Sequence, residues 1–402
     1  MKRILYILFL FVNITSKGIF AQENHALSQN DPHVQNSLGE QYRIEENYSQ
    51  ASYWFKLAAS QEYANAQFNL GSLFFLGLGV PQDYTRAVHY WRLAAEQGLA
   101  VAQNSLGSLY AQGRVVLLNF IQATYWIRLA AVQGYVPAQA NLGNLYINGL
   151  VNGSGIQINI SRAVYWWELA AEQGNEIAQI NLGLLYLNGL LIPPDFIQAA
   201  HWLRLAAKQG NPQAQHNLGA LYNQGLGVAQ DNAQAAYWLR LAAEQGYIMA
   251  QAYLGIVYAQ GLGVPQNFQL AAYWLRLAAE QGYSESQFYL GVYYFEFSMP
   301  HNHEQAAYWL RLAAEQGHAE AQFNLGGLYF RGLGVPQNYV QAMYWYRLSA
   351  KQGHKISQFN IGVAYGQGRG VPQNFQLAVY WLVLAADQGH KEALMLLRAL
   401  QH

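Results

Sequence analysis

One phrase returns ten times along this chain: an aromatic pair, a short spacer, and then a leucine followed by two small residues and usually by Gln-Gly. The leucines that mark the ten copies are Leu57, Leu93, Leu129, Leu169, Leu205, Leu241, Leu277, Leu312, Leu348 and Leu384. Their spacing is 36 residues in most intervals, with one interval of 40 and one of 35. A period of this length predicts a solenoid of stacked repeats rather than one globular core, because each repeat buries its apolar face only against its neighbours.

Each repeat has the pattern of two amphipathic helices joined by a loop, as residues 214–246 illustrate. Ala214, Leu218 and Leu221 form a stripe at helical spacing, and the glycine after Leu218 recurs in the same register of the other repeats. Glycine inside a helix costs about 1 kcal/mol relative to alanine, so its recurrence indicates a close helix contact that excludes a side chain. The following loop is rich in glycine, and Asp231 is placed to cap a second helix.

This pattern resembles the Sel-one-like repeat (SLR), a relative of the tetratricopeptide repeat. The resemblance rests on Ala-x-x-x-Leu-Gly-x-x-Tyr-x-x-Gly-x-Gly-Val at 214–228 and Ala-x-x-Trp-x-x-x-Ala-Ala-x-x-Gly at 235–246, and it covers about residues 33–400. It implies an all-α fold, a right-handed α-solenoid superhelix of about ten antiparallel helix pairs, closed by a C-terminal capping helix over Lys391–Leu400. It also implies that the first helices line a concave side and that this side binds protein or peptide.

The N-terminal residues differ from the repeats. Met1-Lys2-Arg3 is basic, residues 4–12 are an unbroken apolar run, and Ala21 precedes a polar stretch. This is the layout of a secretory signal peptide, and the run is too short for a typical spanning helix. The expected division is a signal over 1–21, a linker over 22–32 and the repeats over 33–402. We therefore expect export to a bacterial periplasm or to the outside of the cell, without a stable membrane span after cleavage; an uncleaved anchor is the alternative.

Composition narrows the classes of function. The chain has no cysteine, so it has no disulfide, no thiol nucleophile and no thiolate metal site. Lysine plus arginine and aspartate plus glutamate both number 22, and removal of Lys2, Arg3 and Lys17 with the signal leaves 19 against 22, a net charge of −3. Nucleic acid is not an expected partner, because its binding needs a basic surface that displaces counterions.

The candidate binding surface follows from helix geometry. Counted from the first-helix leucine, positions −2, +2 and +5 face away from the core stripe, given 100° per residue. The predicted concave-face residues are Phe288, Val292, Phe295, Phe323, Phe330, Phe359 and Val363 in repeats eight to ten, Ile180, Leu184 and Leu187 in repeat five, and Phe68 and Phe75 in repeat two. One interpretation is a groove for an apolar segment of a partner. The other is that these rings pack against adjacent first helices.

Two further columns are expected to be structural. A glutamine lies three residues before the first-helix leucine in every repeat, and its amide is expected to hydrogen-bond between repeats or to loop backbone. An arginine recurs on the second helices, often four residues before a glutamate, as at Arg240 and Glu244. Such pairs indicate a solvated helix face.

No catalytic motif is recognisable. His303-Glu304 begins like a zinc-protease helix, but Ala307 stands where the second histidine is needed. His318, His354 and His390 share one register in successive repeats, and stacking separates them too far to share an ion. Serine-hydrolase signatures are absent from the sequence.

The sequence therefore predicts an exported, monomeric, non-enzymatic scaffold without cofactor or metal, whose partner is a protein or peptide. Two alternatives stay open. One is a cell-envelope protein that binds or processes peptidoglycan or β-lactam, since aromatic grooves also take sugars and the resemblance extends to relatives linked to such ligands. The other is a lumenal adaptor of a eukaryotic secretory pathway, which fits the repeat equally well.

Overall fold

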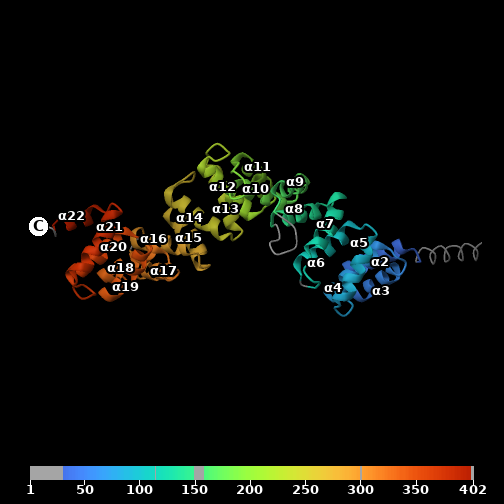
Figure 1. Ribbon diagram of the computed structural model, residues 1–402, viewed down its shortest axis with the longest axis horizontal. Coiled ribbons are helices and arrows are strands. Elements are labelled where there is room, and N and C mark those ends of the chain that lie inside the picture. Colours follow the sequence, from blue (N-terminus) through green and yellow to red (C-terminus); the bar gives the residue numbers. More distant parts are fainter. Residues whose placement is uncertain (1–29, 114, 149–157, 299–300, 400–402) are drawn as a thin grey trace, which may run out of the picture. The chain divides into compact units, whose positions relative to one another are not determined.

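The computed structural model describes residues 30–113, 115–148, 158–298 and 301–399. These residues form 21 α-helices and no strands (Figure 1). The predicted all-α repeat fold of about ten helix pairs plus a closing helix is confirmed. The signal predicted over 1–21 lies outside the described residues.

Every repeat contributes a first and a second helix of similar length. The first helices are α2 (Pro32–Ile44), α4 (Ala64–Leu76), α6 (Ala100–Gln112), α8 (Val136–Asn148), α10 (Glu176–Asn188), α12 (Pro212–Gln224), α14 (Ile248–Gln260), α16 (Ser284–Glu296), α18 (Ala319–Arg331) and α20 (Lys355–Gln367). The second helices are α3 (Tyr48–Ala59), α5 (Tyr84–Glu96), α7 (Phe120–Val132), α9 (Ile160–Glu172), α11 (Phe196–Lys208), α13 (Asn232–Glu244), α15 (Phe268–Glu280), α17 (His303–Glu315), α19 (Tyr339–Lys351) and α21 (Phe375–Asp387). A last helix, α22 (Lys391–Ala399), follows the tenth repeat.

The chain divides into two compact halves, an N-terminal half made of 1–185 with 190–192 and a C-terminal half made of 186–189 with 193–402. From α2 to α9 in the first half, and from α11 to α22 in the second, each helix packs against the next helix along the chain. Contacts are therefore made between neighbours, as expected of a repeat protein. None of the described helices combines the length and the apolar character that crossing a bilayer requires.

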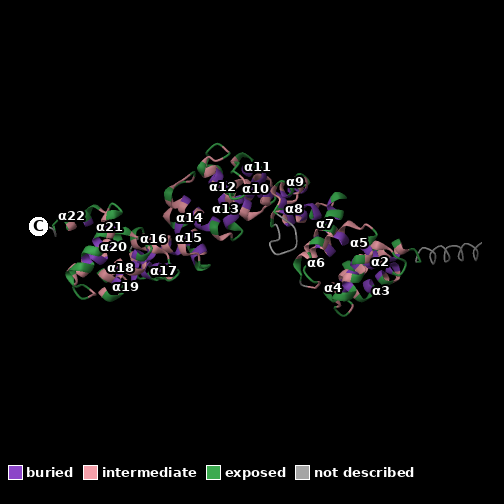
Figure 2. Ribbon diagram, in the orientation of Figure 1, coloured by how far each residue is buried: buried purple, intermediate pink, exposed green. Residues whose placement is uncertain are grey.

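Local capping explains where the helices begin and end. Asp231 has an extended backbone, and its Oδ1 accepts a hydrogen bond from the main-chain NH of Gln234 at 3.0 Å, so the predicted cap of α13 is confirmed. Gly225 ends α12 with a φ of 68°, a left-handed conformation that glycine adopts without steric cost. Figure 2 shows buried positions along the helices of both halves, while the connecting loops are exposed or intermediate.

The helical glycine marks the closest contact within a repeat. A Cβ added at Gly219 would lie 2.9 Å from Leu239 Cγ and 3.1 Å from the Ala235 carbonyl oxygen, on the second helix of the same repeat. Leu218 and Leu239 are both fully buried beside it. The sequence-based inference that this glycine excludes a side chain is therefore confirmed.

The glutamine column is structural. Gln251 is buried; its Nε2 donates to the Ala243 carbonyl at 3.2 Å, and its Oε1 accepts from Gln281 Nε2 at 2.9 Å. The bond to Ala243 joins two repeats, and the bond from Gln281 lies within one repeat. The bond to an alanine carbonyl of the preceding repeat recurs along the chain, so the expected hydrogen bonds between repeats are confirmed.

Most of the second-helix arginines are exposed, as predicted, but the expected pairs with glutamate are largely not formed. Arg240 and Glu244 approach to 3.8 Å, but they are the one pair of this kind among the described residues. Several of the other arginines donate to a tyrosine hydroxyl of the next first helix, as Arg347 does to Tyr365 at 2.8 Å. The planar guanidinium reaches across the repeat boundary and tightens it.

Candidate functional site

The predicted concave-face residues all lie on first helices and are all partly buried. Three of the phenylalanines occupy position −2 and contact the histidine that directly precedes α18, α20 or α22; Phe288 and Phe359 are stacked on it, and Phe323 is tilted. The ring centroids are 4.6 Å apart for Phe288 and His318, 4.7 Å for Phe323 and His354, and 4.4 Å for Phe359 and His390. Such contacts stabilise the repeat boundary, so the packing interpretation accounts for at least one face of each of these rings.

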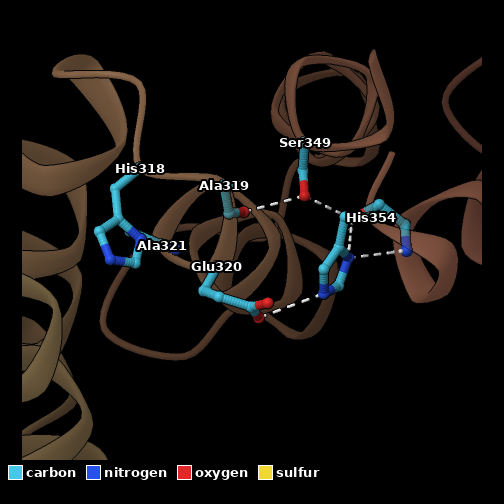
Figure 3. Close-up of polar contacts among 7 residues, drawn as sticks. His318, Ala319, Glu320, Ala321, Ser349 and His354 are labelled. Atoms are coloured by element: carbon cyan, nitrogen blue, oxygen red, sulfur yellow. Dashed lines mark hydrogen bonds and ion pairs between the residues drawn. The ribbon is translucent and has the colours of Figure 1, made fainter. Parts of the chain in front are cut away.

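The histidines are themselves tied to two repeats. The Nδ1 atom of His354 accepts a hydrogen bond from the main-chain NH of Ser357 at 3.1 Å and so caps α20, while its Nε2 lies 3.1 Å from Glu320 of the preceding first helix (Figure 3). An Nδ1 that accepts leaves the proton on Nε2, which then donates to the carboxylate. His318 repeats both contacts with Ala321 and Glu285. Within the described ranges no three His, Asp or Glu residues gather into a metal site.

Positions +2 and +5 and the smaller zones have more varied neighbours. Phe330 packs edge-on against Tyr339 at 5.1 Å, and Phe68 and Phe75 both stack on Trp91, at 5.9 and 5.1 Å. The remaining predicted residues of repeats five and ten, Ile180, Leu184, Leu187 and Val363, are partly buried in α10 and α20.

Three of the predicted residues, Val292, Phe295 and Phe323, meet at a hollow of about 130 Å³ between α16 and α18. We call it the Gly327 hollow. Its other lining residues are Glu296, Leu310, Asn324, Gly327, Leu328, Arg331, Tyr346 and Asn360. Phe288, Phe330, Phe359 and Val363 do not line it. The structure therefore brings together part of the predicted apolar zone and surrounds it with polar groups that were not predicted.

Tyr346 places a hydroxyl in this hollow. The residue belongs to the second helix α19 and is only 5% exposed. Its ring crosses the helical glycine of α18, since a Cβ at Gly326 would lie 2.7 Å from Tyr346 Cδ1, and its Oη lies 3.8 Å from the Cβ position of Gly327. Burial raises the pKa of Tyr346 to about 12, against the opposing effects of the Arg331 charge and a hydrogen bond with Asn360. The phenol is therefore protonated at neutral pH and can donate.

The register of Tyr346 explains why it was missed. Counting outward-facing positions on first helices alone excludes every residue of the second helices. The same register holds Leu239, Leu275, Leu310 and Leu382 in other repeats, each of which packs on the helical glycine of its own repeat. The first four repeats have Phe55, Trp91, Ile127 and Trp167 at this register. A comparison of second-helix registers within the chain would therefore have shown Tyr346 as one of several aromatic residues there, and it would not have shown the hollow.

A second hollow, of about 220 Å³, lies on the other side of Val292. We call it the Phe268 hollow. Its lining includes Ile256, Phe268, Leu275, Tyr289, Val292 and Phe297. It is mainly apolar, and it joins repeats seven and eight as the Gly327 hollow joins repeats eight and nine. Val292 lines both, so the two hollows adjoin at this residue.

The charged groups at the Gly327 hollow are Glu296 at the end of α16 and Arg331 at the end of α18. Both are exposed, and in the described part of the chain they form no ion pair with each other. Asn324 and Asn360 add amides that can donate and accept. The arrangement offers hydrogen bonds and charge to a ligand, and it contains no nucleophile paired with a base.

Comparison with known proteins agrees with this architecture. A family model described as Sel1 repeat matches ten consecutive segments: 32–63, 64–99, 100–135, 136–175, 177–211, 212–247, 248–283, 284–318, 319–354 and 355–390. No curated protein sequence matches the chain.

Two solved structures are similar over most of the chain. A protective antigen present in uropathogenic Escherichia coli strains, displaying an SLR fold, is 37% identical with a TM-score of 0.85, over 93% of this chain and 80% of that one. A Sel1 repeat protein from Oxalobacter formigenes is 34% identical with a TM-score of 0.60, over 75% of this chain and 87% of that one.

Proposed function

Because the chain belongs to the Sel1-repeat family, whose members generally mediate protein–protein interaction, we propose that it is an exported scaffold that binds a segment of a partner protein. The proposed binding surface is the first-helix face of repeats seven to nine, which carries the Gly327 and Phe268 hollows. The observation that carries the proposal is this pair of adjoining hollows, because consecutive pockets along a repeat protein suit consecutive side chains of an extended ligand.

A non-enzymatic role is supported by what lines the hollows. Hydrolysis or group transfer needs a nucleophile held by a base, or two acid–base groups in mutual reach. The Gly327 hollow offers one carboxylate, one guanidinium, two amides and a protonated phenol, and the lining residues of the Phe268 hollow are mainly apolar. These groups suit recognition.

Export is proposed from the basic and apolar start of the sequence. The similar Escherichia coli protein is described as a protective antigen, and a bacterial envelope or extracellular location for this chain is in keeping with that description. N-terminal sequencing of the purified protein tests the proposal. A mature protein that begins at Gln22 is expected, and one that retains Met1 contradicts cleavage.

A cell-wall fragment is the second candidate ligand, because Phe268, Tyr289 and Phe297 place aromatic rings around one hollow and such rings can stack on sugars. Titration calorimetry with muropeptides separates the two candidates. Binding that disappears in Tyr289→Ala would favour the cell-wall fragment, and no heat of binding would remove it.

Site-specific cross-linking tests the proposed surface. A photoreactive phenylalanine analogue at Gln260, on the exposed rim of the Phe268 hollow, is expected to capture a protein from the envelope fraction. The matched control places the same analogue at Tyr344, which is 51% exposed on the second helix α19. Capture at Gln260 alone supports binding on the first-helix face. Equal capture at both positions, or capture at Tyr344 alone, contradicts it.

A further inference from the structure

We propose that the Gly327 hollow recognises the carboxylate of an acidic side chain in the partner segment, while an apolar side chain of the same segment occupies the adjoining Phe268 hollow. The proposal rests on the proposed function and adds the chemistry of the ligand to it. It is carried by a glycine and a tyrosine of repeat nine that meet at one point, where repeats seven, eight and ten have larger and apolar residues, and by the polar groups around that point.

The first difference between repeat nine and repeats seven, eight and ten is the absence of a side chain at position +2. Position +2 of the first helix holds Ile256, Val292 and Val363 in repeats seven, eight and ten, but Gly327 in repeat nine. A Cβ at Gly327 would meet only the Tyr346 hydroxyl, at 3.8 Å, so packing does not exclude a side chain there. A glycine within a helix costs about 1 kcal/mol of stability. Gly327 therefore opens a space while lowering the stability of α18, and close packing does not require a glycine there.

The second difference is a polar group, the hydroxyl of Tyr346, which lies beside Gly327. Repeats seven, eight and ten hold Leu275, Leu310 and Leu382 where repeat nine holds Tyr346. The leucines complete an apolar contact on their helical glycines, whereas the tyrosine carries a hydroxyl past Gly326 to the hollow. Asn360 donates a hydrogen bond to this hydroxyl, since that bond lowers the pKa of Tyr346, and the hydroxyl's own proton can therefore be donated to a ligand in the hollow.

The electrostatics at the base of the hollow favour an anion. The positive charge of Arg331 and a hydrogen bond with Asn360 both lower the pKa of Tyr346 against the effect of burial, and no carboxylate contributes to that pKa. Glu296 also lines the hollow, but it does not contribute to that pKa. A carboxylate at this point can accept hydrogen bonds from the phenol, the Asn360 amide and the guanidinium. A lysine or arginine side chain would meet the charge of Arg331 instead.

The residues that form the walls of the Gly327 hollow indicate which acidic side chain fits it. Phe295, Phe323 and Val292 surround the hollow with apolar surface, and its volume of about 130 Å³ suits one side chain rather than a chain segment. A glutamate has an apolar stem for these walls and a charged end for the base, and aspartate is its shorter equivalent. Because Val292 also borders the Phe268 hollow, the acidic residue and the apolar residue are expected within a few residues of each other.

Selection from a library of random octapeptides, acetylated at the N-terminus and amidated at the C-terminus, tests the inference with the folded chain. We expect the enriched peptides to carry Asp or Glu within four residues of a large apolar residue. Changing that acidic residue to Gln or Asn should weaken binding at least tenfold in fluorescence anisotropy, because a hydrogen bond to a charged group contributes more than a neutral one. Arg331→Gln should cause a similar loss, whereas Arg240→Gln, on the outer helix α13, should leave the affinity unchanged.

Two further variants distinguish loss of the site from loss of the fold. Gly327→Val and Tyr346→Leu restore residues that neighbouring repeats carry at the same positions, so both should melt like the parent protein. Both variants should nevertheless bind the acidic peptide at least tenfold more weakly than the parent protein does. Unchanged affinity of Gly327→Val for the acidic peptide would overturn the inference. Enrichment of neutral or basic peptides would also overturn it, and so would a peptide whose sole carboxylate is its C-terminus if it bound as tightly as the acidic peptide. Failure to enrich any peptide would instead contradict the proposed function.

Discussion

Two consecutive glycines of α18 are expected to respond to alanine with opposite signs. At Gly326 a Cβ would lie 2.7 and 2.8 Å from the Tyr346 ring and 3.2 Å from the Ala342 carbonyl oxygen, closer than such atoms approach in proteins. At Gly327 the nearest atom is the Tyr346 hydroxyl, at 3.8 Å, which is an ordinary contact. Both positions lie in the same helix, so the intrinsic gain from replacing glycine should be the same.

The magnitudes follow from two effects. Alanine is more favourable than glycine in a helix by about 1 kcal/mol, so Gly327→Ala should stabilise by about that amount. Adding a methyl group to a filled core typically costs about 1–3 kcal/mol. Tyr346 is only 5% exposed and has little room to move, so Gly326→Ala should lie about 1–3 kcal/mol below Gly327→Ala in stability.

Hydrogen exchange of the amides of α18 and α19, followed by mass spectrometry, is the suitable assay, because a repeat protein can open one part at a time and a single melting temperature averages over all repeats. Protection should rise in Gly327→Ala and fall in Gly326→Ala. In a Tyr346→Ala background the difference between the two variants should shrink, since the clashing ring has been removed. Equal protection in the two single variants would refute the steric account of the helical glycine.

Three other perturbations have defined outcomes. Phe323→Ala should lower stability by about 2 kcal/mol, less than the 3–5 kcal/mol of a fully buried ring, because the ring is only partly buried beside Tyr346 and His354; an unchanged urea midpoint would contradict its packing role. Gln251→Leu should cost about 1–2 kcal/mol by removing one hydrogen bond to the preceding repeat and one within its own repeat, and Gln269→Leu, at an exposed site, should cost almost nothing in the same titration. Burial lowers the pKa of His216, so the unfolded chain takes up a proton that the folded chain does not, and stability should fall as the pH drops below about 6.5. His216→Asn, which places there the residue that repeat three has, should flatten that dependence in melts between pH 7 and 5, and an unaltered slope would contradict it.

Much of the fold could be predicted from the sequence because the same pattern recurs in ten repeats, so a feature inferred from one repeat can be checked in the others. The 36-residue period, the glycine after Leu218 and the aspartate at 231 each predict a feature that the structure contains: stacked helix pairs, a close helix contact and a helix cap. These features are local or concern adjacent helices, and their geometry follows from helical periodicity and backbone hydrogen bonding. The amide column at Gln251 was predicted for the same reason.

The arginine column shows where that reasoning fails. Most arginines of the column are exposed as predicted, but Arg347 is only partly exposed and donates to Tyr365 of the next repeat, a contact that was not predicted. Spacing within one helix identifies the partners that the helix itself provides, and it does not reveal partners on the following helix.

The same distinction applies to the candidate site. Helical geometry alone placed Val292, Phe295 and Phe323 on one face of successive first helices, and the amino-acid sequence was sufficient for that. Whether such a ring packs or binds depends on what the neighbouring repeat places against it, and only the tertiary structure decided that Phe323 packs against His354 while also bordering a hollow. The hollow itself depends on Tyr346, which reaches across Gly326 from another helix. The positions of these two residues in their own helices do not specify this contact, because it is made between helices. Periodicity determines the face of a helix on which a side chain lies, whereas packing between helices determines which faces leave space for a ligand.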